Sequence, residues 1–98
     1  MNDLQIAQKY INLANSARSR GKEFNLSITS VRNLLLAKKC YYTGLPLTNE
    51  SRSIDRIDNN KGYVKGNVCA CHVRINLLKA DLSVSDIIRL AKKLDKFK

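Results

Sequence analysis

The sequence is poor in acids and in histidine. Eight Asp and Glu stand against eighteen Lys and Arg, giving a formal net charge of +10, and His72 is the single histidine. No run approaches the ~18 consecutive apolar residues of a membrane-spanning helix. The first ten residues, MNDLQIAQKY, contain an acid and no apolar run, which argues against a signal peptide. We therefore expect a cytoplasmic protein with no membrane partner.

The cysteines also lack a standard pattern. Cys40, Cys69 and Cys71 form no CxxC pair, and their odd number argues against a secreted disulfide framework. A zinc module built from them with His72 is the least favoured interpretation, because Cys69 and Cys71 have an unusual spacing for a chelate. We expect reduced, buried thiols and no structural zinc.

The positive charge is distributed along the whole chain. A length of 98 residues suits one small domain. The basic residues extend from Lys9 to Lys98 rather than forming a tail. A compact cation of this kind attracts polyanions and gains affinity by releasing their counterions. The charge favours DNA, or alternatively RNA, as the partner of a monomer or weak dimer.

Apolar spacing predicts two helices in the N-terminal part. Residues 3–18 have helical periodicity, and Gly21 is a plausible stop. Ser27 or Thr29 would cap a second helix that ends before Cys40. The expected apolar face of the first helix consists of Leu4, Ile6, Ala7, Tyr10, Ile11, Ala14 and Ala17.

A β-hairpin that leads directly into a helix is predicted for the middle of the chain. Residues 53–57 and 68–71 favour strands, joined by a loop rich in Asn and Gly. Helical spacing begins at about Ala70 and continues to about Asp81. The core candidates of this helix are Val73, Leu77 and Leu78.

The C-terminal segment has the clearest helical pattern. Ser83 and Asp86 have the spacing of a capping box, and four lysines crowd the far end of the helix. The whole chain, 1–98, is thus predicted to be one α+β domain. Its parts are a helical N-terminal part (1–39), a hairpin-helix core (40–82) and a C-terminal helix (83–98).

The predicted hairpin and helix bring metal-ligating groups together. Asp55 at a strand end and Asn76 on the following helix offer oxygen ligands suited to one Mg²⁺ or Mn²⁺ ion. His72 lies four residues before Asn76, so both would share a helix face. His72 is therefore a candidate third ligand or general base. A plainer interpretation is that Asp55 and Asp58 pair with nearby arginines on the surface.

The stretch from Cys40 to Ser83 resembles the HNH, or ββα-metal, nucleases, and especially their small phage-type members. The matching segments are CYYTG, SIDRIDNNKGYVKGNV and HVRINLLKADLS, and the upstream RSRGKEFNLSITSVRNLL resembles the lead-in of those proteins. The resemblance implies a divalent-metal-dependent DNA endonuclease that leaves a 3′-hydroxyl and a 5′-phosphate. A monomer would nick one strand.

The resemblance also assigns roles by position. Asp55 matches the metal-binding acid, and Asn76 matches the second metal ligand. Asn67 matches the Asn that braces the loop through hydrogen bonds to the backbone. Lys79 matches a helix lysine able to approach phosphate. The residues expected to bind nucleic acid are Arg56, Lys61, Lys65, Arg74 and Lys79.

One position departs from the family pattern. Arg56 occupies the place of the catalytic histidine, and a guanidinium group cannot accept a proton from water. His72 or Asp58 could replace that base, or Arg56 could clamp phosphate while the metal lowers the pKa of its bound water. The alternative is a scaffold that has lost catalysis and binds nucleic acid or a protein partner.

Overall fold

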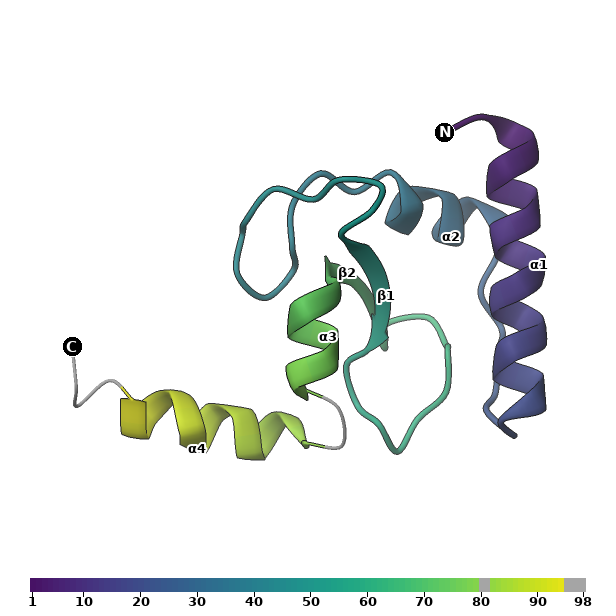
Figure 1. The fold of residues 1–98 in the computed structure, drawn as a ribbon. Coiled ribbons are helices and arrows are strands. Elements are labelled where there is room, and N and C mark those ends of the chain that lie inside the picture. The colour runs from purple at the N-terminus through teal and green to yellow at the C-terminus, as the bar shows by residue number, and fades with distance from the viewer. Residues whose placement is uncertain (80–81, 95–98) are drawn as a thin grey trace.

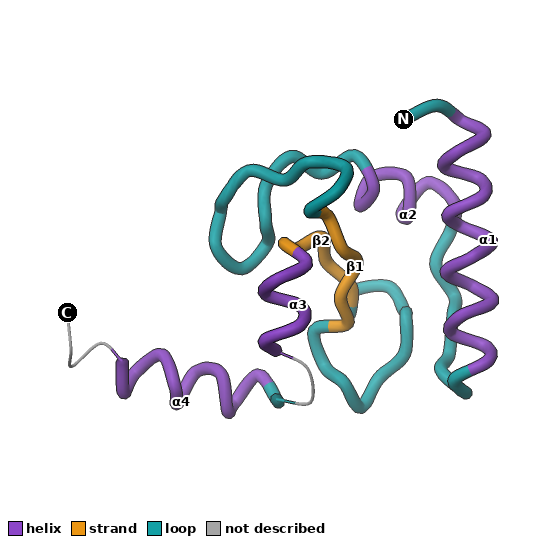
Figure 2. Tube along the Cα trace, viewed as in Figure 1, coloured by secondary structure: helices purple, strands orange, loops and turns teal. Residues whose placement is uncertain are grey.

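The computed structural model describes residues 1–79 and 82–94, and Figure 1 shows their arrangement. A two-stranded hairpin lies at the centre, with α1 and α2 on one side and α3 on the other (Figure 2). The predicted α+β class, with a hairpin followed by a helix, is confirmed. In chain order the elements are α1 (Asp3–Ser19), α2 (Ile28–Leu35), β1 (Arg52–Arg56), β2 (Val68–His72), α3 (Val73–Lys79) and α4 (Val84–Leu94).

Helix α1 begins with a reciprocal cap. The Asn2 side chain accepts the Gln5 backbone N–H, and the Gln5 side chain accepts that of Asn2. The helix is followed by Gly21, whose φ of 67° is the left-handed conformation typical of a helix end. The predicted apolar face is only partly correct, because Leu4 and Ile11 are exposed while others of that face pack inward.

Helix α2 starts at the predicted cap. The Ser27 side chain accepts the backbone N–H of Ser30. The apolar residues of α2 pack in the first core cluster together with residues of α1 and of the loop after β1. The buried members of that cluster are Ile6, Ala17, Leu26, Val31, Leu35 and Tyr63.

The hairpin is antiparallel, and its register separates two faces. Asp55 is opposite Cys69, and Ser53 is opposite Cys71, so these four side chains share one face. Ile54 and Val68 belong to the other face and pack against the first core cluster. A second cluster forms around Cys40, Leu47, Ala70 and Cys71, with Tyr42 and Ile75 packed against it.

Helix α3 begins later than the spacing predicted. Strand β2 continues to His72, so the expected helical start at Ala70 is wrong. The expected core residues Leu77 and Leu78 are 72% and 74% exposed. The inward positions are instead Ile75, which packs on the second cluster, and Lys79, which is buried. The polar residues Asn76 and Lys79 of α3 contact the hairpin.

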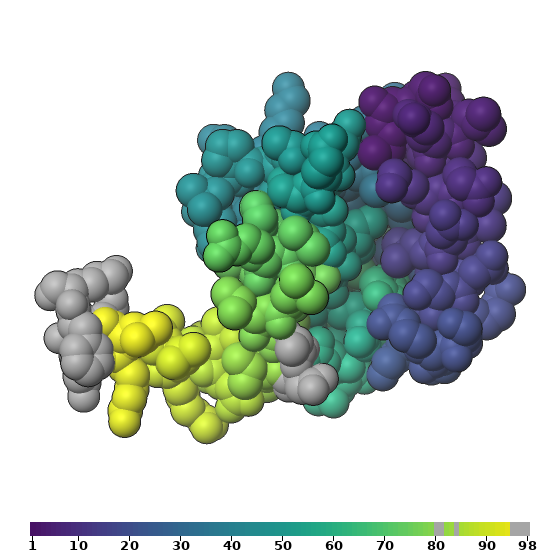
Figure 3. Space-filling view, viewed as in Figure 1, coloured from purple at the N-terminus to yellow at the C-terminus, as the bar shows by residue number. Residues whose placement is uncertain are grey.

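Helix α4 extends away from the rest of the molecule (Figures 1 and 3). The predicted capping box is present: the Ser83 hydroxyl accepts the Asp86 N–H, and the Asp86 carboxylate accepts the Ser83 N–H. Lys92 and Lys93 lie in the last turn, whereas Lys96 and Lys98 are outside the described residues. Within the described residues, no helix combines the length and apolar character needed to cross a bilayer.

Candidate metal and nucleic-acid site

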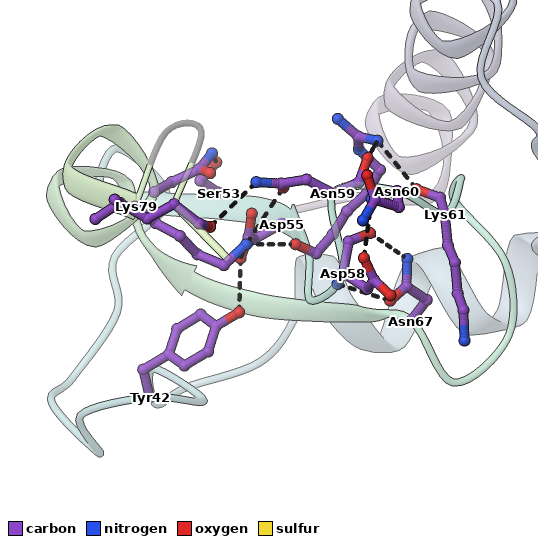
Figure 4. A network of polar contacts seen from close by, with 12 residues as sticks. Tyr42, Ser53, Asp55, Asp58, Asn59, Asn60, Lys61, Asn67 and Lys79 are labelled. Carbon is purple, nitrogen blue, oxygen red and sulfur yellow. Dashed lines mark hydrogen bonds and ion pairs between the residues drawn. The ribbon is translucent and has the colours of Figure 1, made fainter. Parts of the chain in front are cut away.

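Asp55 is a buried carboxylate near the end of β1, with a relative exposure of 6%. The Tyr42 hydroxyl donates to its Oδ2 at 2.7 Å, and the Lys79 ammonium lies 3.3 Å from the same oxygen (Figure 4). A charge this deeply buried requires a partner and hydrogen bonds. Asp55 receives both contacts from outside β1, one from the loop before β1 and one from α3.

Lys79 points inward rather than toward a bound phosphate. It is 3% exposed, and its Nζ donates to the Arg56 carbonyl at 2.7 Å and to Asn59 Oδ1 at 3.4 Å. With the Asp55 contact, these acceptors match the three donors of an ammonium group. The expected contact of Lys79 with phosphate does not fit this position. Its geometry is that of a counter-ion that ties α3 to the hairpin end.

Three groups beside Asp55 have a raised pKa, namely Tyr42, Cys69 and Cys71. Burial, followed by the hydrogen bond to Asp55, raises the pKa of Tyr42, so its hydroxyl stays a donor. Burial also raises the pKa of Cys71 to about 12 and raises the pKa of Cys69. Cys40 is buried and free, and its sulfur accepts the His72 N–H.

Among the described residues, no group of three or more His, Cys, Asp or Glu could hold a metal ion.

Asn67 braces the loop that follows β1. Its Oδ1 accepts the Asp58 N–H at 2.9 Å, and its Nδ2 donates to the carbonyls of Asp58 and Gly62 at 3.1 and 2.9 Å. The resemblance implied contacts of this kind with the loop backbone, and Figure 4 shows those between Asn67 and Asp58. Asp58 itself caps a turn by accepting the Asn60 N–H. Asn67 is thus a positioning residue, and Asp58 is a loop residue.

Asn76 and Asp55 line the same pocket. The Asn76 Nδ2 donates to Ser53 Oγ at 2.8 Å, which orients the amide on the Asp55 face of the hairpin. The pocket has a volume of ≈ 260 Å³, and its lining is mostly polar. The lining residues are Arg20, Ile54, Asp55, Arg56, Asn59, Tyr63 and Asn76. A second hollow of ≈ 360 Å³ lies between α1 and β1, and among the described residues its lining shares Ile54 with this pocket and includes no acid.

Arg56 is restrained by the loop. Its Nη1 donates to the carbonyls of Asn59 and Lys61 at 2.9 and 3.0 Å. Its guanidinium carbon lies 5.5 Å from the centroid of the Tyr63 ring. Arg56 makes no ion pair with Asp55 among the described residues, so the surface Arg–Asp pairing is not observed. The guanidinium lines the pocket as a fixed cation.

His72 lies apart from the candidate ligands. It is the last residue of β2, and strand alternation assigns it to the face opposite Ser53 and Cys71. Its Nδ1 accepts the Arg74 N–H at 3.1 Å, which caps the start of α3. The expectation that His72 and Asn76 share a helix face is wrong, and His72 does not line the Asp55 pocket.

The remaining predicted nucleic-acid residues are on the surface. Lys61, Lys65 and Arg74 are exposed, and none lines the pocket. They contribute to the general positive field around the hairpin. Arg20, in contrast, lines the pocket and was missed by sequence reasoning. Its only signal was membership in the basic run RSRGK, because its proximity to Asp55 depends on tertiary structure.

Comparison with known proteins identifies viral relatives. No protein-family model matches the chain. It is 40% identical over 77 residues to an uncharacterized 29.0 kDa protein from the dda-modA intergenic region of Enterobacteria phage T4, covering 74% of this chain and 31% of that protein. It is 35% identical over 83 residues to uncharacterized protein R423 of Acanthamoeba polyphaga mimivirus, covering 84% of this chain and 15% of that protein. The chain therefore spans a third or less of the curated relatives it matches.

Proposed function

We propose that this protein is an HNH-like, divalent-metal-dependent DNA endonuclease. The observation that carries the proposal is the shared pocket of Asp55 from the hairpin and Asn76 from the adjoining helix. Carboxylate and amide oxygens suit a hard cation. The hairpin-then-helix order and the brace of Asn67 are the features expected of such a scaffold.

The donor set fits a Mg²⁺ or Mn²⁺ ion. Asp55 uses Oδ2 for Tyr42 and Lys79, which leaves Oδ1 as the ligand oxygen. Asn76 uses its amide nitrogen for Ser53, which leaves its carbonyl oxygen. Two protein ligands suffice for an ion that retains several waters and takes further oxygens from a phosphate. When bound, such an ion supplies positive charge for the phosphate and activates water.

The protein side chains have distinct parts in this proposal. Tyr42 and Lys79 hold the Asp55 carboxylate in place. Arg56 presents a fixed cation to a phosphate in the pocket. Asn67 fixes the backbone of the loop after β1, so that the carbonyl groups to which Arg56 donates stay in position. Each of these contacts acts on position or charge, and none transfers a proton.

The decisive experiment is plasmid nicking across divalent ions. Wild-type protein is expected to nick supercoiled DNA with Mg²⁺ or Mn²⁺ and to stop in excess chelator. Asp55→Ala and Asn76→Ala should reduce nicking to background, whereas Asp86→Asn and Asn60→Ala, at exposed positions, should not. Circular dichroism verifies that Asp55→Ala still folds, and the half-buried Asn76 provides the variant least at risk of unfolding. Equal nicking by wild type and Asn76→Ala would refute the proposal.

A second function, nucleic-acid binding without catalysis, is favoured by the lack of a base. Within the described residues, the pocket holds no histidine, and Arg56 cannot accept a proton. A binder should shift DNA mobility equally with metal and with chelator, and Asn76→Ala should leave the shift unchanged. Arg56→His discriminates further. A gain in nicking of about 10²–10⁴-fold would identify an impaired catalyst, and a loss would assign Arg56 a positive role.

A further inference from the structure

Two arginines from distant parts of the chain meet at one tyrosine. The guanidinium carbons of Arg20 and Arg56 each lie 5.5 Å from the centroid of the Tyr63 ring. Arg20 also donates from Nη2 to the Tyr63 hydroxyl. Aromatic rings attract guanidinium groups at this distance. The ring of Tyr63 therefore gathers two cations at the rim of the Asp55 pocket, where both line the wall.

The backbone fixes the end of α1 against the loop that carries Tyr63. Tyr63 N–H donates to the Glu23 carbonyl at 2.7 Å, and Asn25 N–H donates to the Tyr63 carbonyl at 3.1 Å. The approach is so close at Gly62 that a Cβ there would come within 2.4 Å of the Glu23 carbonyl oxygen. Arg20, three residues before Glu23, is therefore held at the pocket by a bonded segment rather than by its own side chain alone.

The two arginines have no acidic partner among the described residues. The carboxylate of Asp55 lines the same pocket, and it is paired with Lys79. The ion pairs of the described residues are Lys79–Asp55 and Arg89–Asp86. Arg20 and Arg56 thus bring positive charge that pairs with no carboxylate of the described residues. Two uncompensated guanidinium groups beside a polar pocket favour a bound anion.

Both guanidinium groups retain donors for such an anion. Arg56 uses Nη1 for backbone carbonyls, and Arg20 uses Nε for the Ser16 carbonyl and Nη2 for Tyr63. Arg56 Nε and Nη2 and Arg20 Nη1 make no hydrogen bond to another described residue. The planar fork of arginine matches the oxygens of a phosphate group.

We infer that Arg20 and Arg56, gathered on Tyr63, form a clamp for a backbone phosphate of DNA beside Asp55. Arg20 is the new element, because it extends the site from the hairpin-helix core to the end of α1. The inference rests on the proposed function only in taking the anion to be a nucleic-acid phosphate. It requires binding and does not require catalysis.

The test measures binding of a fluorescent duplex oligonucleotide by anisotropy in excess EDTA, over a series of salt concentrations. Arg20→Gln is expected to weaken binding roughly tenfold and to reduce the salt slope by about one. Arg18→Gln is the matched control, because Arg18 is exposed in the last turn of the same helix and does not line the pocket. Arg18→Gln is expected to change affinity less than about twofold, because Arg18 contributes only to the overall positive charge of the surface.

Two further variants separate binding from folding. Arg20→Lys keeps the charge and loses the fork, so it should recover the salt slope but only part of the affinity. Tyr63→Phe keeps the ring and removes the hydroxyl that accepts from Arg20, so it should weaken binding a few-fold. Thermal unfolding of each variant verifies that it is folded at the temperature of the assay.

Equal effects of Arg20→Gln and Arg18→Gln on affinity and salt slope would overturn the clamp, as would wild-type protein that does not bind the duplex. The outcome is independent of the nicking assay. If binding depends on Arg20 but the protein does not nick DNA, the nuclease proposal is refuted and the clamp is supported. If Arg20→Gln does not change the nicking activity, the clamp is refuted and the nuclease proposal is supported.

Discussion

The hairpin end buries polar side chains, whereas the two C-terminal helices expose apolar ones. At the hairpin end, Asp55 and Asn67 are buried, together with Lys79 from the last position of α3. On α3 and α4, the apolar side chains of Leu77, Leu78 and Leu90 are mostly exposed. Among the described residues, every buried side-chain nitrogen or oxygen has a hydrogen-bond partner.

This difference indicates what each region does for the protein. Buried polar groups are tolerated only when their contacts are complete, so the hairpin end depends on each member of its network. The exposed leucines bury little surface and should contribute little to folding. The comparison therefore predicts large losses of stability when the buried polar residues are substituted, and small losses when the exposed leucines are substituted.

The largest effect should come from Lys79→Met. Removing the ammonium leaves the Asp55 carboxylate buried without its cation, which should lower the free energy of unfolding by about 3–5 kcal/mol. Urea denaturation followed by circular dichroism measures the loss. Lys92→Met, at an exposed lysine on α4, is the control and should change stability by less than about 0.5 kcal/mol.

A double-mutant cycle with Asp55→Leu sharpens this test. Replacing both charges removes the uncompensated carboxylate. The double variant should therefore lose less free energy of unfolding than the two single variants lose in sum. Additive costs would show that the two charges do not depend on each other. That result would contradict the assignment of Lys79 as the counter-ion of Asp55.

Asn67→Ala should have the next largest effect. It removes three hydrogen bonds to the backbone of the loop after β1, two of them to Asp58, and should cost about 1–3 kcal/mol. Hydrogen exchange of the Asp58 amide should accelerate along with the global loss. Asn60→Ala, an exposed asparagine of the same loop, is the comparison and should have a much smaller effect. Similar losses from the two variants would mean that Asn67 does not brace the loop.

The sequence predicted most of the scaffold because its signals are local. The caps at Ser27 and Ser83 and the turn residues of the central loop depend on neighbours within a few residues. These signals predicted the α+β class, whereas the meeting of Asp55 and Asn76 in one pocket was predicted from the hairpin-then-helix pattern and the resemblance to HNH nucleases.

The remainder of the site depends on contacts distant in sequence. Lysine patterns indicate exposed positions, so nothing local indicates that Lys79 is buried against Asp55, 24 residues earlier in the numbering. The place of Arg20 depends on the pairing of Phe24 with Tyr63. His72 was assigned to a helix because helical spacing begins near Ala70, whereas the strand pairing with Arg52 extends β2 to His72.

The smallest effect should come from Leu78→Gln. Its side chain is 74% exposed, so the substitution removes little apolar surface from contact and should change the free energy of unfolding by less than about 0.5 kcal/mol. Ile75→Gln on the same helix is the matched control, because Ile75 packs against the second cluster and should cost more than 1 kcal/mol, on the order of a core truncation. The same urea titration measures both variants. A loss from Leu78→Gln as large as that from Ile75→Gln would show that the exposed side of α3 is covered in solution, and the contrast between the two regions would then fail.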